Sequence, residues 1–125
     1  MEQYLYDWIT KAEEDLTVIK RLTEDDIYAH SAVCFHCQQL AEKYLKLYLL
    51  KQGDELKKTH NIEFLLEKCS EFDSDFSAID PMNLSDYGVQ IRYPDDMYVP
   101  DDEEVLVYKE LAISIRNMVR LKMGL

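Results

Sequence analysis

Apolar residues recur every three or four positions along the first part of the chain. The residues that keep this spacing are Leu5, Trp8, Ala12, Leu16, Ile19 and Leu22. Because an α-helix has 3.6 residues per turn, this spacing places them on one stripe. We therefore predict a first helix over about residues 2–22, with this stripe packed against the rest of the protein.

A second and longer apolar pattern begins after a short polar segment. Thr23-Glu24-Asp25-Asp26 has the S/T-x-x-D/E form of a capping box, and the apolar positions resume at Ile27. They continue to Gly53, a residue type that often follows the end of a helix. The pattern predicts a helix of about 26 residues over 27–53.

Three shorter patterns follow. A stripe that includes Ile62 and Leu66 predicts a third helix over about 61–70. Asp80-Pro81 resembles a helix cap followed by a first-turn proline, which predicts a fourth helix to about Gln90. The acidic residues 101–104 predict the start of a last helix, because carboxylates favour a helix N-terminus. Its inner positions are Val105, Tyr108, Ala112, Ile115 and Val119.

The fold class follows from these five predicted helices. No segment alternates convincingly between apolar and polar residues, and 3 Gly and 3 Pro in 125 residues leave few tight turns for an all-β protein. We predict an all-α protein, an antiparallel up-and-down helical bundle of about five helices. The length is typical of one domain, so residues 1–125 are expected to form a single domain.

Composition excludes several classes of protein. A net charge of −11 disfavours a general binder of duplex DNA or RNA, because Lys and Arg supply most non-specific affinity for phosphates. The three cysteines have no scaffold spacing, and Cys34-x-x-Cys37 lies inside a helical pattern, which disfavours zinc or redox chemistry. No apolar run is long enough to span a membrane, and the first residues are acidic, so we expect a cytoplasmic protein.

The segment "HCQQLAEKYLK", residues 36–46, places polar side chains inside the most apolar part of the chain. At 100° per residue, the polar side chains share one arc of the helix, and the apolar ones form a core stripe opposite. The arc consists of Gln38, Gln39, Glu42, Lys43 and Lys46. Two interpretations are open: a solvent face with an ion pair between Glu42 and Lys46, or a binding site.

Three segments carry a resemblance to a known family. "FHCQQLAEKYLKLYLL", "KKTHNIEFLLEKC" and "IRYPDDMY" resemble the HEPN domain family (higher eukaryotes and prokaryotes nucleotide-binding), over roughly residues 5–120. The resemblance implies a helical bundle similar to the C-terminal domain of kanamycin nucleotidyltransferase. It also implies a chain that is often dimeric, that is often encoded beside a small nucleotidyltransferase as in a toxin–antitoxin pair, and that binds nucleotides or RNA.

The same resemblance implies a set of site residues. Gln39, Glu42 and Lys43 match the polar patch of the family's second helix, His60 matches its T-H step, and Arg92 and Tyr93 match its R-Y-P. Lys46, on the same arc as Lys43, adds a cation for phosphate, and Tyr93 offers a stacking surface for a base. We expect a nucleotide of the ATP or GTP class, or an RNA end, with no cofactor of its own and Mg²⁺ only with the nucleotide.

One family motif is missing. Many HEPN proteins are ribonucleases with an R-x(4–6)-H motif; here Arg116-Asn117 resembles its start, but Leu121, Lys122 and Met123 occupy the histidine positions. We therefore expect a binding protein that is non-catalytic or only weakly catalytic. Two alternatives remain: a ribonuclease that uses Arg92 and His60, or a purely structural interaction module.

A homodimer is also expected from the sequence. Several apolar and aromatic residues fall outside the predicted core stripes and have surface to cover. They are Tyr4, Tyr6, Tyr28, Phe35, Leu47, Leu50 and Tyr98.

Overall fold

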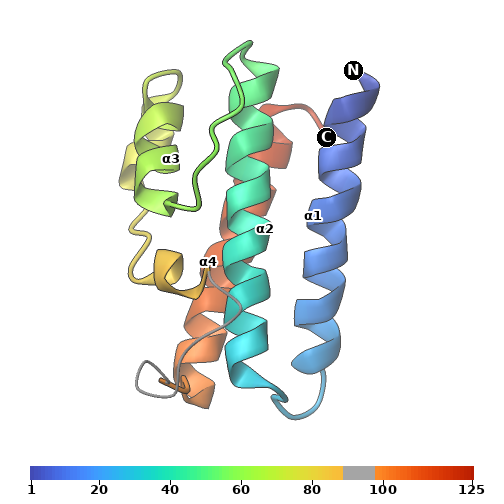
Figure 1. The fold of residues 1–125 in the computed structure, drawn as a ribbon, viewed down its shortest axis with the longest axis vertical. Helices are drawn as coiled ribbons and strands as arrows, with labels where there is room; N and C mark the ends of the chain where they lie inside the picture. Colours follow the sequence, from blue (N-terminus) through green and yellow to red (C-terminus); the bar gives the residue numbers. More distant parts are fainter. Residues whose placement is uncertain (89–97) are drawn as a thin grey trace.

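The computed structural model describes residues 1–88 and 98–125 and contains four α-helices (Figure 1). They are α1 (Gln3–Leu22), α2 (His30–Lys51), α3 (Ile62–Ser70) and α4 (Asp102–Lys122). Two short 3₁₀ helices, η1 (Ser74–Ala78) and η2 (Leu84–Tyr87), lie between α3 and α4. The described ranges contain no strand, so the all-helical class is confirmed, whereas the count of five helices is not.

Side chains cap the starts of α3 and α4, and the acids 101–104 start α4 as the sequence predicts. The Asn61 side chain accepts a hydrogen bond of 2.9 Å from the Phe64 N–H at the start of α3. At the start of α4, Asp101 accepts one of 2.9 Å from the Glu104 N–H, and three further acids follow in the first turn. The Asn61 and Asp101 side chains satisfy N–H groups that have no partner inside the helix, and the acids of the first turn of α4 favour its positive end.

The predicted start of the second helix is wrong. The Thr23 hydroxyl donates to the Ile19 carbonyl at 2.7 Å, so this residue closes α1 and does not cap α2. The chain then passes through Ala29, whose φ of 52° lies in the left-handed region, and α2 begins at His30. The capping-box pattern at residues 23–26 therefore belongs to the connection between the two helices.

The predicted fourth helix is also wrong where the structure describes it. Asp80 accepts a hydrogen bond from the Met82 N–H at 2.9 Å, and Met82 has a φ of 51°. A left-handed residue at this position stops an α-helix from continuing out of Asp80-Pro81. Only η2 follows, and residues 89–90 of the prediction lie outside the described residues.

The helices do not follow an up-and-down order. α1 runs antiparallel to α2, but α2 and α4 run in the same direction (Figure 1). Their first residues meet where His30 Nε2 lies 2.6 Å from Asp102 Oδ1, and Arg120 near the end of α4 donates to the Tyr44 hydroxyl at 3.2 Å. The up-and-down part of the predicted fold is therefore wrong.

The link between α2 and α3 explains part of this change in direction. Residues 52–61 run back beside α2, so α3 starts near the middle of α2 and points the same way (Figure 1). The Gln38 side chain on α2 donates to the His60 carbonyl at 3.0 Å, directly before α3 begins. Ten extended residues span up to about 33–36 Å, which is long enough to return along most of a 22-residue helix.

The α2 helix lies between the other elements and is buried on most sides. Its predicted core stripe is buried, and so is Leu47, which the sequence placed outside that stripe. Phe35 and Leu50 are partly buried. These three residues therefore give little support to a self-association surface, and α2 has no broad solvent face on which polar residues would be expected.

Candidate functional site

Three polar residues of the α2 arc are buried. The exposed fractions are 0% for Gln38, 5% for Glu42 and 6% for Lys46. The solvent-face interpretation is therefore wrong for these residues. Burial of charged side chains costs free energy unless hydrogen bonds and opposite charges compensate it, so their partners decide what the site can do.

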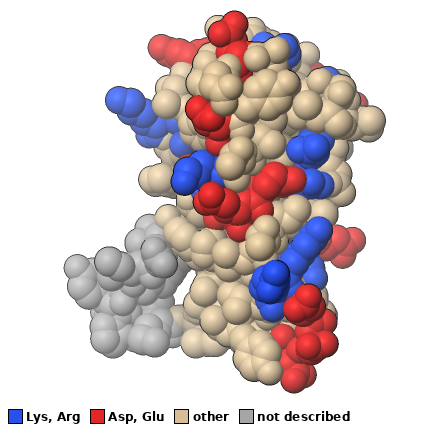
Figure 2. Space-filling view, turned by 90° about the vertical axis from the view of Figure 1, so that its right-hand side faces the viewer, with Lys and Arg blue, Asp and Glu red and all other residues tan. Residues whose placement is uncertain are grey.

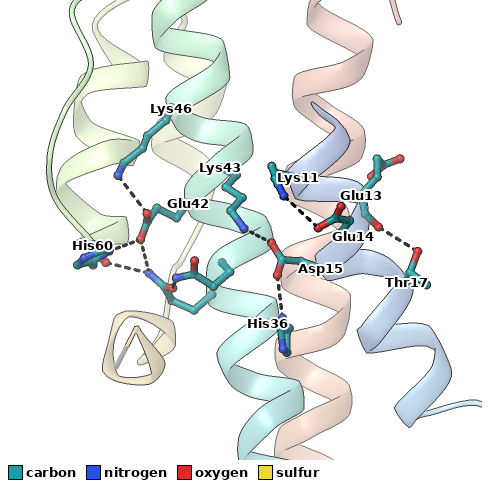
Figure 3. A network of polar contacts seen from close by, with 12 residues as sticks. Lys11, Glu13, Glu14, Asp15, Thr17, His36, Glu42, Lys43, Lys46 and His60 are labelled. Carbon is teal, nitrogen blue, oxygen red and sulfur yellow. Dashed lines mark hydrogen bonds and ion pairs between the residues drawn. The ribbon is translucent and has the colours of Figure 1, made fainter. Parts of the chain in front are cut away.

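The carboxylate of Glu42 is the centre of a polar cluster between α2 and the start of α3 (Figure 3). Its Oε1 accepts a hydrogen bond of 3.0 Å from Gln38 and lies 2.8 Å from His60 Nδ1, and its Oε2 lies 3.0 Å from Lys46 Nζ. Burial raises the pKa of Glu42, but these hydrogen bonds and the Lys46 charge outweigh it and leave the pKa below its ordinary value. The cluster therefore holds an ionised carboxylate. We call Gln38, Gln39, Glu42, Lys46 and His60 the Glu42 cluster.

The amide of Gln38 connects this cluster to neighbouring segments. Its nitrogen donates to both Glu42 and the His60 carbonyl, and its oxygen accepts from the Gln39 amide at 2.7 Å. Gly88, directly after η2, packs against it: a Cβ at this position would lie 3.2 Å from Gln38 Nε2. The close approach explains why a residue without a side chain suits this position.

His60 is the exposed member of the Glu42 cluster. Its side chain is 70% exposed, whereas that of Glu42 is 7% exposed. Because Nδ1 faces an ionised carboxylate, the neutral ring carries its proton there and presents Nε2 as an acceptor. A buried carboxylate thus fixes the orientation and tautomer of an imidazole that a ligand can reach.

Lys43 does not belong to the Glu42 cluster. It points from α2 toward α1, where its Nζ lies 2.6 Å from Asp15 Oδ2 (Figure 3). The other oxygen of Asp15 lies 2.7 Å from His36 Nδ1. The predicted site is therefore divided between two sides of α2, with Lys43 in a separate group of Asp15, His36 and Lys43.

Sequence reasoning missed Asp15 and His36, although one signal was present for Asp15. Asp15 is three residues after Ala12 and four before Ile19, so it occupies a position of the buried stripe of α1. It is indeed buried. An acid at such a position needs a cation from another element, and the 28 residues that separate it from Lys43 hide this pairing from local pattern analysis.

Arg92 and Tyr93 lie outside the described residues. Their predicted roles in phosphate binding and base stacking therefore stay predictions. The described part of the predicted nucleotide site consists of Glu42 with Lys46 and His60 bound to its carboxylate and Gln39 bound to the neighbouring Gln38, whereas Lys43 is directed toward α1.

Arg116, which resembles the start of the missing ribonuclease motif, joins α4 to α1. Its Nε and Nη2 donate to the two carboxylate oxygens of Glu13 at 2.9 and 2.5 Å, and Nη1 donates to Asn117 at 2.8 Å. Hydrogen bonding to Arg116 lowers the pKa of Glu13. This bidentate pair accounts for Arg116 as an interhelical contact.

The cysteines are free thiols in the core. Burial raises the pKa of Cys34 and Cys69 to about 12 and raises the pKa of Cys37 as well. Such thiols are poor nucleophiles and poor metal ligands at neutral pH. Over residues 1–88 and 98–125, no group of three or more His, Cys, Asp or Glu side chains is arranged to hold a metal ion.

Within residues 1–88 and 98–125, no helix is both long enough and apolar enough to cross a bilayer.

Comparison with known proteins identifies the family. The family model of the HEPN domain matches residues 5–122, which is nearly the whole chain. Comparisons with curated proteins and with solved structures gave no match. The similarity to kanamycin nucleotidyltransferase therefore stays a prediction. The match over residues 5–122 shows that this chain belongs to the HEPN domain family.

Proposed function

We propose that this protein binds a nucleotide of the ATP or GTP class, or an RNA end, at the Glu42 cluster. HEPN membership supports a nucleotide- or RNA-related role. The observation that carries the proposal is the buried carboxylate of Glu42, which fixes the exposed ring of His60 at 2.8 Å. A cluster that served stability alone would gain little from orienting a ring that lies mainly in solvent.

The chemistry of the cluster suits recognition of a nucleotide. His60 offers a nitrogen to a hydroxyl or, when protonated, a charge to a phosphate. The partly buried Gln39 donates to Gln38, which leaves its amide oxygen to accept from a base edge. Lys46 is occupied by Glu42, so we assign it mainly to holding the carboxylate. Arg92 and Tyr93 are expected to complete the site, and Mg²⁺ is expected only with the bound nucleotide.

Calorimetric titration tests this proposal. ATP, GTP and a short single-stranded RNA are each added with and without Mg²⁺ to the wild type, His60→Ala and Arg92→Ala. We expect saturable binding that both variants weaken by about tenfold. His30→Ala is the matched control, because His30 also pairs with a carboxylate but at the start of α2. Binding that is equally affected in all three variants would contradict the proposal.

The Glu42–His60 pair also favours a second candidate function, a ribonuclease with a non-standard site. A carboxylate that fixes the protonated Nδ1 of a histidine leaves Nε2 able to act as a general base. Cleavage of labelled RNA that is lost in His60→Ala while binding is retained would support this enzyme. If the wild type does not cleave RNA and His60→Ala weakens binding, the result supports a binding protein without this activity.

We further propose that the protein forms a homodimer and partners a small nucleotidyltransferase in a toxin–antitoxin-like pair. The partner proposal rests on the family resemblance. The dimer proposal has additional support from two exposed tyrosines near the starts of α2 and α4, Tyr28 and Tyr98. Sedimentation equilibrium would show a dimer, and co-expression with a nucleotidyltransferase encoded beside this gene would show a stable complex.

A further inference from the structure

A hollow of about 340 Å³ lies between α1 and α2 and is not part of the Glu42 cluster. Four of its lining residues, Tyr4, Asp7, Trp8 and Lys11, come from α1, and Lys43 comes from α2. Positions 4, 7, 8 and 11 follow the i, i+3, i+4, i+7 spacing and therefore share one side of the helix. Figure 2 shows the side of the molecule on which α1 lies, where charged groups are interleaved with uncharged surface.

The hollow and the Glu42 cluster lie on different sides of α2. Lys43 points toward α1, whereas Glu42, Lys46 and His60 gather on the side of α3 (Figure 3). Lys43 is held in place by Asp15, which is itself buried and paired with His36. A ligand in the hollow would therefore meet a cation that the protein has already positioned.

The lining residues combine aromatic surface with cations. Tyr4 and Trp8 are one helical turn apart, and aromatic rings of this kind provide stacking surfaces for planar heterocycles. Lys11 is 69% exposed and lies 3.8 Å from Glu14, a loose pair that an incoming anion can replace. Lys43 has three N–H donors, of which Asp15 takes one.

The size of the hollow and its one carboxylate narrow the class of ligand further. A volume of about 340 Å³ is near the lower end of the roughly 300–1,000 Å³ of small-molecule sites, which suits one nucleotide better than an RNA chain. Asp7 accepts a hydrogen bond from Gln3 at 3.1 Å and has further acceptor capacity for an amino group or hydroxyl.

We propose that this hollow binds a planar heteroaromatic anion of mononucleotide size. Its ring stacks against Tyr4 and Trp8, its phosphate lies between Lys11 and Lys43, and Asp7 accepts from an amino group or hydroxyl. The choice of a nucleotide rests on the proposed function, but the location does not depend on the Glu42 cluster.

Trp8 provides a direct probe, because it is the single tryptophan of the chain. We expect ATP to quench Trp8 fluorescence saturably and inorganic phosphate to have little effect. Tyr4→Ala and Lys11→Ala should each weaken the affinity by about tenfold, a typical effect of losing a stacking ring or a phosphate contact. Tyr6→Ala and Lys20→Ala are the matched controls, because both residues are exposed on α1 and neither lines the hollow.

Calorimetry on the same variants separates this inference from the proposed function. In one outcome, ATP binds without changing Trp8 fluorescence, and His60→Ala weakens this binding whereas Tyr4→Ala does not. That outcome would overturn the proposed site in the hollow and leave the Glu42 cluster as the binding site. If ATP produces neither a heat of binding nor quenching of Trp8 fluorescence, both the hollow and the Glu42 cluster are overturned as nucleotide sites. Trp8 fluorescence could instead change with protein concentration alone, in a way that Tyr4→Ala removes. This result would identify a protein interface and would also overturn this inference.

Discussion

Lys43 on α2 and Asp15 on α1 form an interhelical ion pair, with 2.6 Å between Nζ and Oδ2. Asp15 is buried, and its second oxygen pairs with His36. The pair explains why a basic residue of the predicted nucleotide site faces away from the other members. It also means that Lys43 contributes to the stability of the helix pair whether or not it binds a ligand.

Lys43→Ala should therefore destabilise the protein. Removing the ammonium group leaves the buried carboxylate of Asp15 with one partner fewer, which we expect to lower the free energy of unfolding by about 1–3 kcal/mol. Urea denaturation followed by circular dichroism measures this change. Lys20→Ala, an exposed lysine of α1, should change stability by less than about 0.5 kcal/mol. Equal stability of the two variants would restore the view that Lys43 is ordinary solvated surface.

Stability should also depend on the ionisation of Glu42. Its pKa in the folded protein lies below the ordinary value of 4.5, so folding favours the ionised form. The resulting stability is fully present above about pH 4.5 and is lost as the pH falls through the lowered pKa. Glu42→Gln should thus be less stable than the wild type at pH 7, with a difference that shrinks in acid. Glu67→Gln, on the exposed side of α3, is the control and should show no such convergence.

Because Arg116 pairs with Glu13 between two helices, replacing Arg116 should lower stability without changing ligand binding. Arg116→Ala removes two hydrogen bonds to one carboxylate and should lower the free energy of unfolding by about 1–2 kcal/mol. Arg116→Lys should restore only part of this stability, because an ammonium group cannot form the bidentate pair. A loss of RNA cleavage in Arg116→Ala at unchanged stability would instead show that Arg116 serves an active site.

The buried thiols should react slowly. Burial raises the pKa of Cys34 and Cys69 to about 12, so very little thiolate is present in the folded protein at pH 8. We expect alkylation by iodoacetamide to be far slower in the native protein than in urea, as measured by mass spectrometry. Rapid modification of Cys34 or Cys37 under native conditions would revive the redox interpretation of the C-x-x-C segment.

The sequence predicts well where a periodic stripe alone decides the structure. The stripe of α1 was expected over about residues 2–22 and is found in Gln3–Leu22, and α4 starts at the acidic residues 101–104 as expected. The start of α2 was missed because Thr23 bonds back to Ile19, and the fourth helix because Met82 adopts a left-handed conformation. Both outcomes depend on backbone geometry that the residue pattern does not specify.

The candidate site shows a different limit. Helical periodicity correctly gathers Glu42 and Lys46 on one arc, but it cannot show what covers that arc. The link that leads to His60 and α3 buries these side chains, and their burial depends on contacts between residues about twenty positions apart. The same limit explains why the sequence grouped Lys43 with these residues. Its partner Asp15 belongs to another helix, which periodicity within α2 cannot reveal.

The site proposed for a nucleotide or an RNA end lies beside His60. The chain has only three histidines, so the imidazole C–H signals of His30, His36 and His60 can be assigned by single substitutions and followed by NMR during titration with ATP, GTP or a short RNA. We predict saturable shifts of the His60 signals, with His30 unchanged as the internal control. Binding that shifts His36, beside Lys43, and leaves His60 unmoved would contradict the claim and place the ligand between α1 and α2.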